Sequence, residues 1–405
     1  MADTESNSPP HPHSTASVVA GFSGWLLDAF DFFLVTVCLT AMARDFHKSD
    51  AQIALVITMT MAFRPLGGFL FGFLADRYGR RVPLMINMSV YAVAGILTGL
   101  APTYASLLVI RALFGVVMGG TWGVGASLAM EGAPARRRGL VSGLVQEGYA
   151  AGNVLAALFY FFCFNSLGWR ALFILSSLPA VVLVPYIYFR VPESPVWRQS
   201  ARVRVPMRMH IREICSHWKL FLYLLAFMTM MLFSSHGTQD MYPTFLERQW
   251  HFAPQLRSAI TAISGVGAIA GGLVFGHLSD LWGRRKAIIA AFVLALLLIP
   301  LWAYAPVQAL LVAGAFLMQF MVQGAWGVIP AHLAELSPSS VRALLPGFAY
   351  QSAGIVASSV VFIEALYAQR TSYATAMALT AASVFVLASV MAFVGRERRG
   401  ADLTA

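Results

Sequence analysis

A short polar cluster interrupts one of the most apolar parts of the chain. In the segment FSSHGTQDMYPTFL, residues 233–246, His236, Gln239 and Asp240 follow an apolar run that begins at Leu220. In a helix, residues three and four apart lie on one face, so these three side chains are expected to share a face. Histidine titrates near physiological pH, and an aspartate beside it stabilises its protonated form. The spacing predicts a group that takes up a proton; the alternative is a polar helix end in contact with lipid headgroups.

Other ionisable side chains also lie inside apolar stretches, where each costs about 2.5–3.5 kcal/mol at the centre of a membrane-spanning helix. They include Asp28, Asp31, Arg64, Arg111 and Glu147. Asp28 and Asp31 are three residues apart in LLDAFDFF and share a helix face. Two carboxylates in a site of low dielectric favour retention of a proton by one of them, which predicts a proton-coupling site. The alternative is that one carboxylate only neutralises Arg64.

Arg64 is the residue best suited to bind an anion. It lies in MTMAFRPLGG, near the middle of an apolar stretch, and Pro65 follows it. Its guanidinium is always charged, and the planar fork matches a carboxylate with two hydrogen bonds. We therefore predict that Arg64 binds an anionic substrate; the alternative is a structural ion pair with Asp28 or Asp31. Arg111 is expected to be a structural or coupling residue that pairs with a carboxylate or extends to the interface.

The apolar stretches that hold these residues set the fold class. The chain has 405 residues, of which 58% are hydrophobic and 11% charged, whereas soluble domains carry about 25% charged residues. Stretches of about 20 apolar residues recur, each long enough to cross the hydrocarbon core as a helix. We predict an all-α membrane protein with twelve transmembrane helices, at 16–40, 52–75, 83–102, 105–130, 139–163, 170–190, 219–245, 257–279, 286–304, 307–332, 344–366 and 372–394.

The basic residues predict the orientation of these spans. With the N-terminus in the cytoplasm, 20 of the 28 lysines and arginines fall in cytoplasmic loops and tails and 6 in outer loops. An excess of lysine and arginine in the loops on one side of the membrane is typical of the cytoplasmic side. The protein is therefore expected in the cell (inner) membrane, with both termini in the cytoplasm. The net charge of +10 needs no nucleic-acid partner to explain it, and the three cysteines indicate no disulfide framework.

An internal repeat indicates two similar halves. GGFLFGFLADRYGRR (67–81) returns as GGLVFGHLSDLWGRR (271–285), and TWGVGASLAMEGAP (121–134) returns as AWGVIPAHLAELSP (325–338), both at an offset of 204 residues. The same offset pairs Glu147 with Gln351, which predicts that both face a central cavity. Such duplication is typical of transporters with a site between the halves. We expect a disordered cytoplasmic tail at 1–15, six-helix bundles at 16–190 and 219–395, a cytoplasmic linker at 191–218 and a cytoplasmic tail at 396–405.

The motifs at 67–81 and 271–285 resemble the signature loop of the major facilitator superfamily. RALFGVVMGG, around Arg111, and PESPVW at 192–197 resemble further elements of that superfamily. The resemblance implies the major facilitator fold, with two pseudosymmetric six-helix bundles. A carboxylate at a helix end that pairs with arginines of a neighbouring loop can hold one conformation and release another. We assign this gating role to Asp76, Arg77, Gly79, Arg80, Arg81, Asp280, Gly283, Arg284 and Arg285, and group Arg111 with them; the alternative is that the arginines only set topology.

The polar cluster carries a closer resemblance. SHGTQDMYPT (235–244) is similar to the span-7 motif of fungal lactate permeases in the sialate:proton symporter branch, Asn-x-x-Ser/Thr-His-x-Ser/Thr-Gln-Asp-x-x-x-Thr. Leu232 stands where that motif has asparagine, which bears on substrate identity more than on coupling. In that branch the histidine and aspartate are tied to proton coupling and substrate affinity, a span-2 arginine to the carboxylate and a span-11 glutamine to recognition. Arg64 and Gln351 fill the last two places here.

These observations lead to a prediction of proton-coupled symport of small monocarboxylates, lactate or pyruvate. We expect proton coupling at Asp28, Asp31, His236, Asp240 and Glu147, and substrate binding at Arg64, Gln351, His236 and Gln239. The alternative substrate is sialic acid or another organic or aromatic acid, and Arg64 disfavours a sugar. From other classes, a transporter-like receptor and a membrane-embedded enzyme remain, but no metal or nucleophile constellation favours an enzyme. The expected partners are the organic anion, protons and the lipid bilayer, with no cofactor, and the chain is expected to be a monomer.

Overall fold

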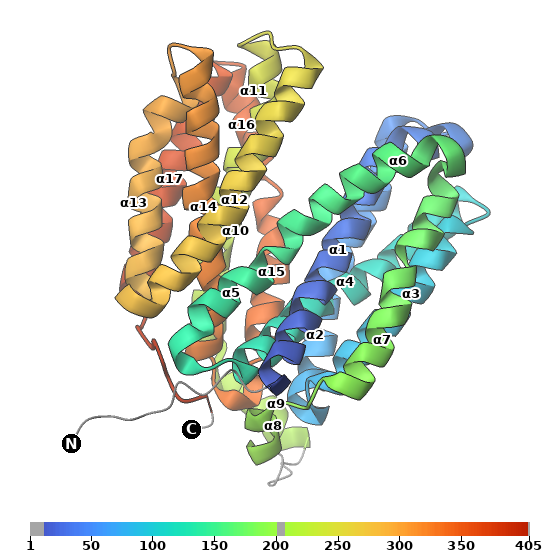
Figure 1. Cartoon of the computed structure of the whole chain (residues 1–405), viewed down its shortest axis with the longest axis vertical. Coiled ribbons are helices and arrows are strands. Elements are labelled where there is room, and N and C mark those ends of the chain that lie inside the picture. The colour runs from blue at the N-terminus through green and yellow to red at the C-terminus, as the bar shows by residue number, and fades with distance from the viewer. Residues whose placement is uncertain (1–11, 201–206, 404–405) are drawn as a thin grey trace.

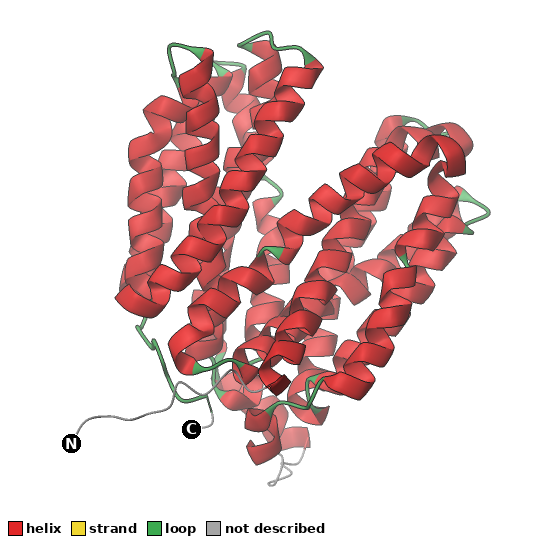
Figure 2. Cartoon of the chain, viewed as in Figure 1, coloured by secondary structure: helices red, strands yellow, loops and turns green. Residues whose placement is uncertain are grey.

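The computed structural model describes residues 12–200 and 207–403, and every regular element in that part of the chain is a helix (Figures 1 and 2). The elements are α1 (Pro12–Asp45), α2 (Asp50–Tyr78), α3 (Arg81–Gly99), α4 (Tyr104–Gly132), η1 (Ala135–Arg137), α5 (Arg138–Gln146), α6 (Gly148–Ser176), α7 (Leu178–Arg190), α8 (Pro195–Ser200), α9 (Met207–Ser216), α10 (Trp218–Gln239), α11 (Tyr242–Arg248), α12 (Pro254–Trp282), α13 (Arg284–Ala303), α14 (Gln308–Leu336), η2 (Ser339–Val341), α15 (Leu344–Ala357), α16 (Val360–Ala368) and α17 (Tyr373–Val394).

The helices make a multi-pass membrane protein. Eleven helical segments in the described residues are long and apolar enough to cross a membrane. One of them, Ala135–Arg190, has 56 residues and holds two of the twelve predicted spans, with a break at Gly168, where φ is 69°. The predicted tail at 1–15 falls largely outside the described residues, and α1 begins at Pro12. The predicted linker at 191–218 contains α8 and α9.

Four predicted spans are broken within their length. The breaks lie at Glu147 between α5 and α6, at Ser177 between α6 and α7, at Asp240 between α10 and α11, and at Ser358–Ser359 between α15 and α16. At each break one or more polar residues separate the two helices, and their backbone dihedral angles stay in the right-handed helical region. Each break is therefore a short interruption of a span and not a loop.

Glycines let the helices of each bundle approach closely, at equivalent places in the two halves. A Cβ atom on Gly67 of α2 would lie 1.7 Å from the carbonyl oxygen of Val116 in α4. A Cβ atom on Gly271 of α12 would lie 1.9 Å from the carbonyl oxygen of Phe320 in α14. Both pairs are related by the offset of 204 residues, so the sequence repeat is also a repeat of packing.

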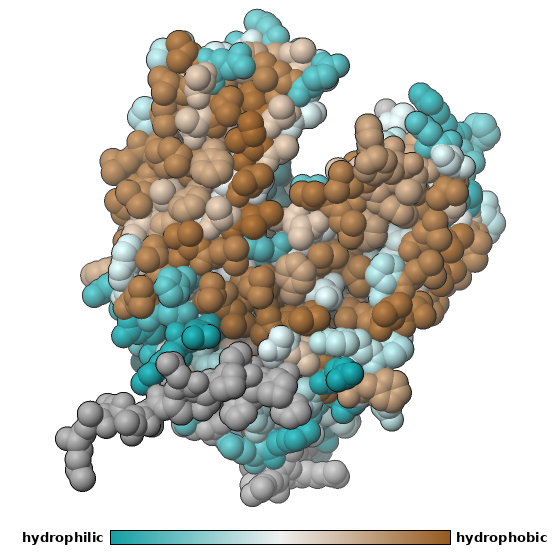
Figure 3. All heavy atoms as spheres, in the orientation of Figure 1, coloured by the Kyte–Doolittle hydropathy of each residue, from teal (hydrophilic) through white to brown (hydrophobic). Residues whose placement is uncertain are grey.

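The two bundles meet at one end and separate at the other (Figure 1). We call the end that holds Asp76 and Asp280 the latch end, and the opposite end the open end. At the latch end backbones touch across the bundles: a Cβ atom on Gly72 would lie 2.6 Å from Cα of Leu344. The space-filling view shows a notch between the bundles at the open end (Figure 3). A solute thus has access to the interface from the open end.

Candidate functional site

Arg64 and Gln351 come from opposite bundles, and both contact Gly119 of α4. Gly119 of α4 packs directly on the Arg64 backbone, since a Cβ atom there would lie 1.9 Å from the Arg64 carbonyl oxygen. Gln351 of α15 donates a hydrogen bond from Nε2 to the Gly119 carbonyl oxygen at 3.2 Å. Gln351 also packs on Gly68, one helical turn from Arg64. The arginine that the resemblance assigns to the carboxylate and the glutamine that it assigns to recognition therefore lie together at the bundle interface.

The Arg64 guanidinium is buried but only partly satisfied. The residue is 8% exposed, and its Nη1 contacts Met61 Sδ at 3.4 Å. Within the described residues, its Nε has no acceptor. The indole Nε1 of Trp25 is likewise a buried donor without an acceptor in that part of the chain. Buried donors are costly unless they are hydrogen-bonded, so both atoms are suited to a ligand with acceptor oxygens.

Aromatic side chains surround Tyr350 beside these donors. The ring centroid of Tyr350 lies 6.1 Å from that of Trp25, 4.7 Å from Trp122 and 5.9 Å from Trp326. Tyr149 stacks on Trp25 at 5.3 Å, and Tyr350 also interacts with the Arg64 guanidinium. The cluster draws on five helices of both bundles. It gives the site apolar walls of fixed shape next to one cation.

Asp28 and Asp31 have different surroundings. Asp31 forms a buried ion pair with Arg111, with 2.7 Å between Oδ2 and Nη1. Asp28 is fully buried, and neither of its carboxylate oxygens has a hydrogen-bond partner in the described chain. Thr121 lies near it, but that hydroxyl donates to Asn87 Oδ1 at 2.8 Å. Arg64 is the cation that acts most strongly on Asp28. The two carboxylates are therefore not an isolated pair that shares a proton.

Arg111 lies in the interior of the first bundle, away from the latch end. Its guanidinium sits 4.2 Å from the ring centroid of Phe114 and pairs with Asp31. This position does not support the gating role grouped with it from the sequence. It fits the structural role that was also expected of Arg111.

The polar cluster of span 7 divides into two parts. His236 Nδ1 lies 3.0 Å from Asp240 Oδ2, and the two side chains are 39% and 38% exposed. Gln239 donates instead to Gln319 Oε1 of α14 at 2.7 Å. The His236–Asp240 pair is therefore accessible, whereas Gln239 is bound to a helix of its own bundle. Tyr149, which is partly buried, lies within electrostatic range of both Arg64 and Asp240.

Glu147 projects across the bundle interface. A Cβ atom on Gly272 of α12 would lie 1.9 Å from its carboxylate Oε1. Gln351, its equivalent in the repeat, occupies the matching place on Gly68. Both side chains thus cross to the opposite bundle, and Glu147 is buried, at 6% exposed.

The latch consists of matching charge clusters in the two halves. Arg80 pairs with Asp76 at 3.1 Å and with Glu131 at 2.9 Å. In the other half, Arg284 pairs with Asp280 at 2.8 Å and with Glu335 at 2.9 Å. Burial alone would lower the pKa of Arg80, but the carboxylates of Glu131 and Asp76 outweigh it and raise the pKa above its ordinary value. Arg80 therefore stays charged in the buried cluster.

Each cluster also binds a helix N-terminus of the opposite bundle. Asp76 accepts hydrogen bonds from the backbone N–H groups of Ala343 and Leu344 at 3.0 and 2.9 Å, at the start of α15. Asp280 accepts from Gly139 and Leu140 at 2.8 and 3.0 Å, at the start of α5. A carboxylate at a helix N-terminus satisfies free N–H groups and interacts favourably with the helix dipole. These bonds join the bundles at the latch end.

Two further arginines cross between the bundles. Arg138 Nη1 lies 2.9 Å from Glu335 Oε1, and Arg342 Nη1 lies 3.4 Å from Glu131 Oε1. Both arginines are related by the offset of 204 residues. The sequence analysis assigned a gating role to neither arginine. The signal that could have found them is the repeat, because the offset of 204 residues relates Arg138 to Arg342 as it relates Glu131 to Glu335.

The remaining signature residues support the loops within each bundle. Gly79 and Gly283 have φ angles of 99° and 100°, in the left-handed region that favours glycine. Arg81 donates to the Ile187 and Tyr188 carbonyl oxygens at the end of α7, and Arg285 holds the end of α17 in the same way. Arg77 lies over the ring of Tyr78. These residues shape the latch without crossing it.

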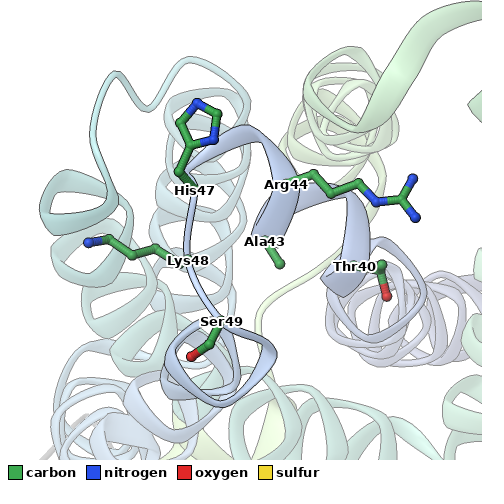
Figure 4. Close-up of a pocket in the computed structure, with 6 residues that line it drawn as sticks. All are labelled: Thr40, Ala43, Arg44, His47, Lys48 and Ser49. Atoms are coloured by element: carbon green, nitrogen blue, oxygen red, sulfur yellow. The ribbon is translucent and has the colours of Figure 1, made fainter.

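Residues 40–49 line a separate surface depression at the end of α1, formed by Thr40, Ala43, Arg44, His47, Lys48 and Ser49 (Figure 4). Its Arg44, His47 and Lys48 side chains point in different directions and do not converge on one position. The depression therefore does not have the geometry of an anion site, unlike the surroundings of Arg64.

The comparisons with known proteins agree with this architecture. Residues 21–247 and 240–404 match the Major Facilitator Superfamily model. The chain is 29% identical to the carboxylic acid transporter protein homolog of Saccharomyces cerevisiae, over 95% of this chain and 68% of the relative. It is 26% identical to the sialic acid transporter NanX of Escherichia coli, over 84% of each chain. The solved proton:xylose symporter XylE superposes with a TM-score of 0.79 at 17% identity, over 98% of each chain. The chain belongs to the Major Facilitator Superfamily.

Proposed function

We propose that the protein is a symporter that carries small monocarboxylates, lactate or pyruvate first, together with protons. The observation that supports this most is the buried Arg64 guanidinium at the bundle interface, whose Nε has no acceptor within the described chain. A permanent cation with a free donor, beside Gln351 and an aromatic wall, fits a carboxylate with a short organic body. The printed names of the relatives, a carboxylic acid transporter homolog and a sialic acid transporter, are compatible with organic acids.

Proton coupling follows from competition for Arg64. Asp28 is the carboxylate on which Arg64 acts, and a buried carboxylate without a hydrogen bond is stable only when it is neutral or paired. With Asp28 ionised, the site is balanced by Arg64 and needs no substrate. When Asp28 takes a proton, Arg64 becomes free to bind the substrate carboxylate. The charge of the site is then the same for the empty form and the loaded form.

Alternating access completes the cycle. The latch closes one end of the interface while the other end is open, and the concentration of basic residues in loops at the latch end favours a cytoplasmic position for it. The structure then represents an outward-facing conformation in the inner membrane, with both termini cytoplasmic. A change of conformation is driven only if proton and substrate bind with different affinity to the two forms. We expect a monomer, since each chain has its own site.

Sialic acid is the second candidate substrate, favoured by the similarity to NanX. It shares the carboxylate that Arg64 would bind but is larger than lactate. A transporter-like receptor would bind an acid without accumulating it.

A panel of acids in proteoliposomes tests the proposal. Unlabelled L-lactate, pyruvate, sialic acid and benzoate would be added one at a time, with a trapped pH dye reporting proton entry. We expect acidification with lactate and pyruvate, since each anion enters with a proton. Acidification with sialic acid alone would replace the substrate, and binding without acidification would favour a receptor.

A further inference from the structure

Glu364 of α16 is a buried acid that the proposed site does not use. It is 1% exposed, and neither carboxylate oxygen has a hydrogen-bond partner in the described part of the chain. It belongs to α16, which lies in the half of the second bundle toward the open end (Figure 1). A carboxylate in such surroundings is stable in its neutral, protonated form.

The side chain packs against the centre of the polar cluster of span 7. A Cβ atom on Gly237 would lie 3.3 Å from Glu364 Oε1. Gly237 directly follows His236, which is paired with Asp240 at 3.0 Å. The absence of a side chain at this position is what lets the acid approach α10.

The groups that face Glu364 contain no compensating cation that acts on it among the described residues. From α10, Asp240 acts on it, and Asp240 is itself bound to His236. From α17, Thr380 lies beside it, although no hydrogen bond forms in this geometry. A second carboxylate nearby opposes ionisation of the first. His236, Asp240 and Glu364 therefore form one group of ionisable side chains with a solvent-accessible part and a buried part.

We propose that Glu364 carries a proton in the transport cycle and exchanges it with the His236–Asp240 pair. This rests on the proposed function. The pair is about two-fifths exposed and takes the proton from solvent. After Glu364 has released its own proton in the opposite conformation, this proton passes to the ionised Glu364 carboxylate, which becomes a neutral acid again, and the pair returns to its starting charge.

The test compares Glu364→Gln, which mimics the protonated acid, with wild type in two assays. Exchange of labelled for unlabelled substrate at equal pH needs no net proton movement, whereas accumulation under an inward proton gradient does. We expect Glu364→Gln to keep exchange within about twofold of wild type and to lose about tenfold or more of gradient-driven accumulation, with a flattened pH profile of uptake. Wild-type accumulation and pH profile in this variant would overturn the proposal, as would loss of exchange in a folded variant.

Two controls keep the result interpretable. Glu247→Gln removes an exposed carboxylate of α11 that pairs with Arg257, and is expected to leave both assays unchanged. Should Glu364→Gln fail to fold, infrared spectroscopy of Glu364→Asp and wild type decides. A protonated-carboxyl band that shifts between them and titrates with pH supports the proposal, and identical bands overturn it. Because the infrared measurement needs no substrate, it remains valid if wild type transports none of the acids tested and the proposed function fails.

Discussion

Arg64 is the single side chain on which the proposed chemistry depends most. The sequence indicated it as a carboxylate ligand, and the structure gives it the burial and the free donor that this role requires. Gln351 reaches the same place because Gly119 brings α4 against α2 and leaves a carbonyl oxygen for the glutamine amide. A buried donor without an acceptor is energetically costly, and a bound carboxylate would remove this cost, as the proposed function requires.

Asp28→Asn tests competition for Arg64. The amide cannot ionise, so Arg64 stays free in every state and the variant mimics the protonated form. We expect substrate exchange at equal pH to be retained within about twofold, and accumulation driven by a proton gradient to fall about tenfold or more. Both are measured as uptake by proteoliposomes. Accumulation at the wild-type level would show that Asp28 is not the coupling residue.

The Asp31–Arg111 pair is expected to matter for stability rather than for coupling. Removing one partner of a buried ion pair leaves an uncompensated charge and costs about 3–5 kcal/mol. Asp31→Asn should therefore lower the thermal unfolding temperature in detergent, and the double variant Asp31→Asn/Arg111→Gln should recover part of the loss. The KM of folded protein should stay within about twofold of wild type. An unchanged unfolding temperature in the single variant contradicts this assignment.

Individual contacts were less predictable than individual residues. The sequence singled out both aspartates, but whether a carboxylate faces Arg64 or Arg111 depends on the rotation of α1 against α2 and α4. The burial of Glu364 was not predictable for the same reason, since it comes from α10 and α17, which are distant in sequence. The division of Gln239 from His236 likewise follows from Gln319 on a different helix.

At the scale of helices, the latch depends on carboxylates that bind helix N-termini of the opposite bundle. Loss of such a cap costs about 0.5–2 kcal/mol. Asp76→Asn and Asp280→Asn should each shift the protein toward a conformation open at the latch end. In a variant without native cysteines, the alkylation rate of Ala334→Cys, buried in α14, should rise about two- to thirtyfold, because 1.4 kcal/mol corresponds to a factor of ten.

The control for that measurement is Asp45→Asn, which alters an exposed carboxylate paired with Arg170. It should leave the alkylation rate unchanged. The two latch variants should act in the same direction because they are equivalent in the repeat. A rate that responds to Asp45→Asn, or to neither latch variant, would contradict the proposed role of the caps.

The repeat predicted the latch in both halves, since the signature motifs occur twice. It did not predict the breaks at Glu147, Ser177 and Ser358, because the hydropathy of these stretches continues across them. A break changes the hydropathy of the surrounding stretch very little, so composition alone does not reveal where a helix is interrupted.

At the scale of the molecule, the two bundles are joined by backbone contacts at glycines. A side chain on Gly72 has no room unless the bundles separate at the latch end. Gly72→Leu should therefore favour the opposite conformation and shorten the distance between spin labels at Lys48→Cys and Gln255→Cys, at the open ends of the two bundles. Gly265→Leu, on a glycine of α12 with open space around it, should leave the distance distribution as in wild type. A distribution that Gly72→Leu does not change would count against rocking of the bundles.

The sequence predicted the number of bundles but not their conformation. Hydropathy and the offset of 204 residues are the same in every conformation of the transport cycle, so they cannot distinguish one conformation from another. Which end of the interface is closed depends on small free-energy differences between the conformations. The structure shows one such conformation, in which the latch is formed and the notch between the bundles is open (Figure 3).

The most direct test of the central claim is uptake of radiolabelled L-lactate by proteoliposomes with and without an inward proton gradient. Wild type would be compared with Arg64→Ala and with Arg44→Ala, which alters an exposed arginine at the open end. The account predicts gradient-stimulated uptake in wild type and in Arg44→Ala. In Arg64→Ala it predicts that this uptake falls about tenfold or more, although the variant unfolds at the same temperature as wild type. Undiminished gradient-driven uptake in Arg64→Ala would contradict the account, and the absence of uptake by folded wild type would rule out lactate as the substrate.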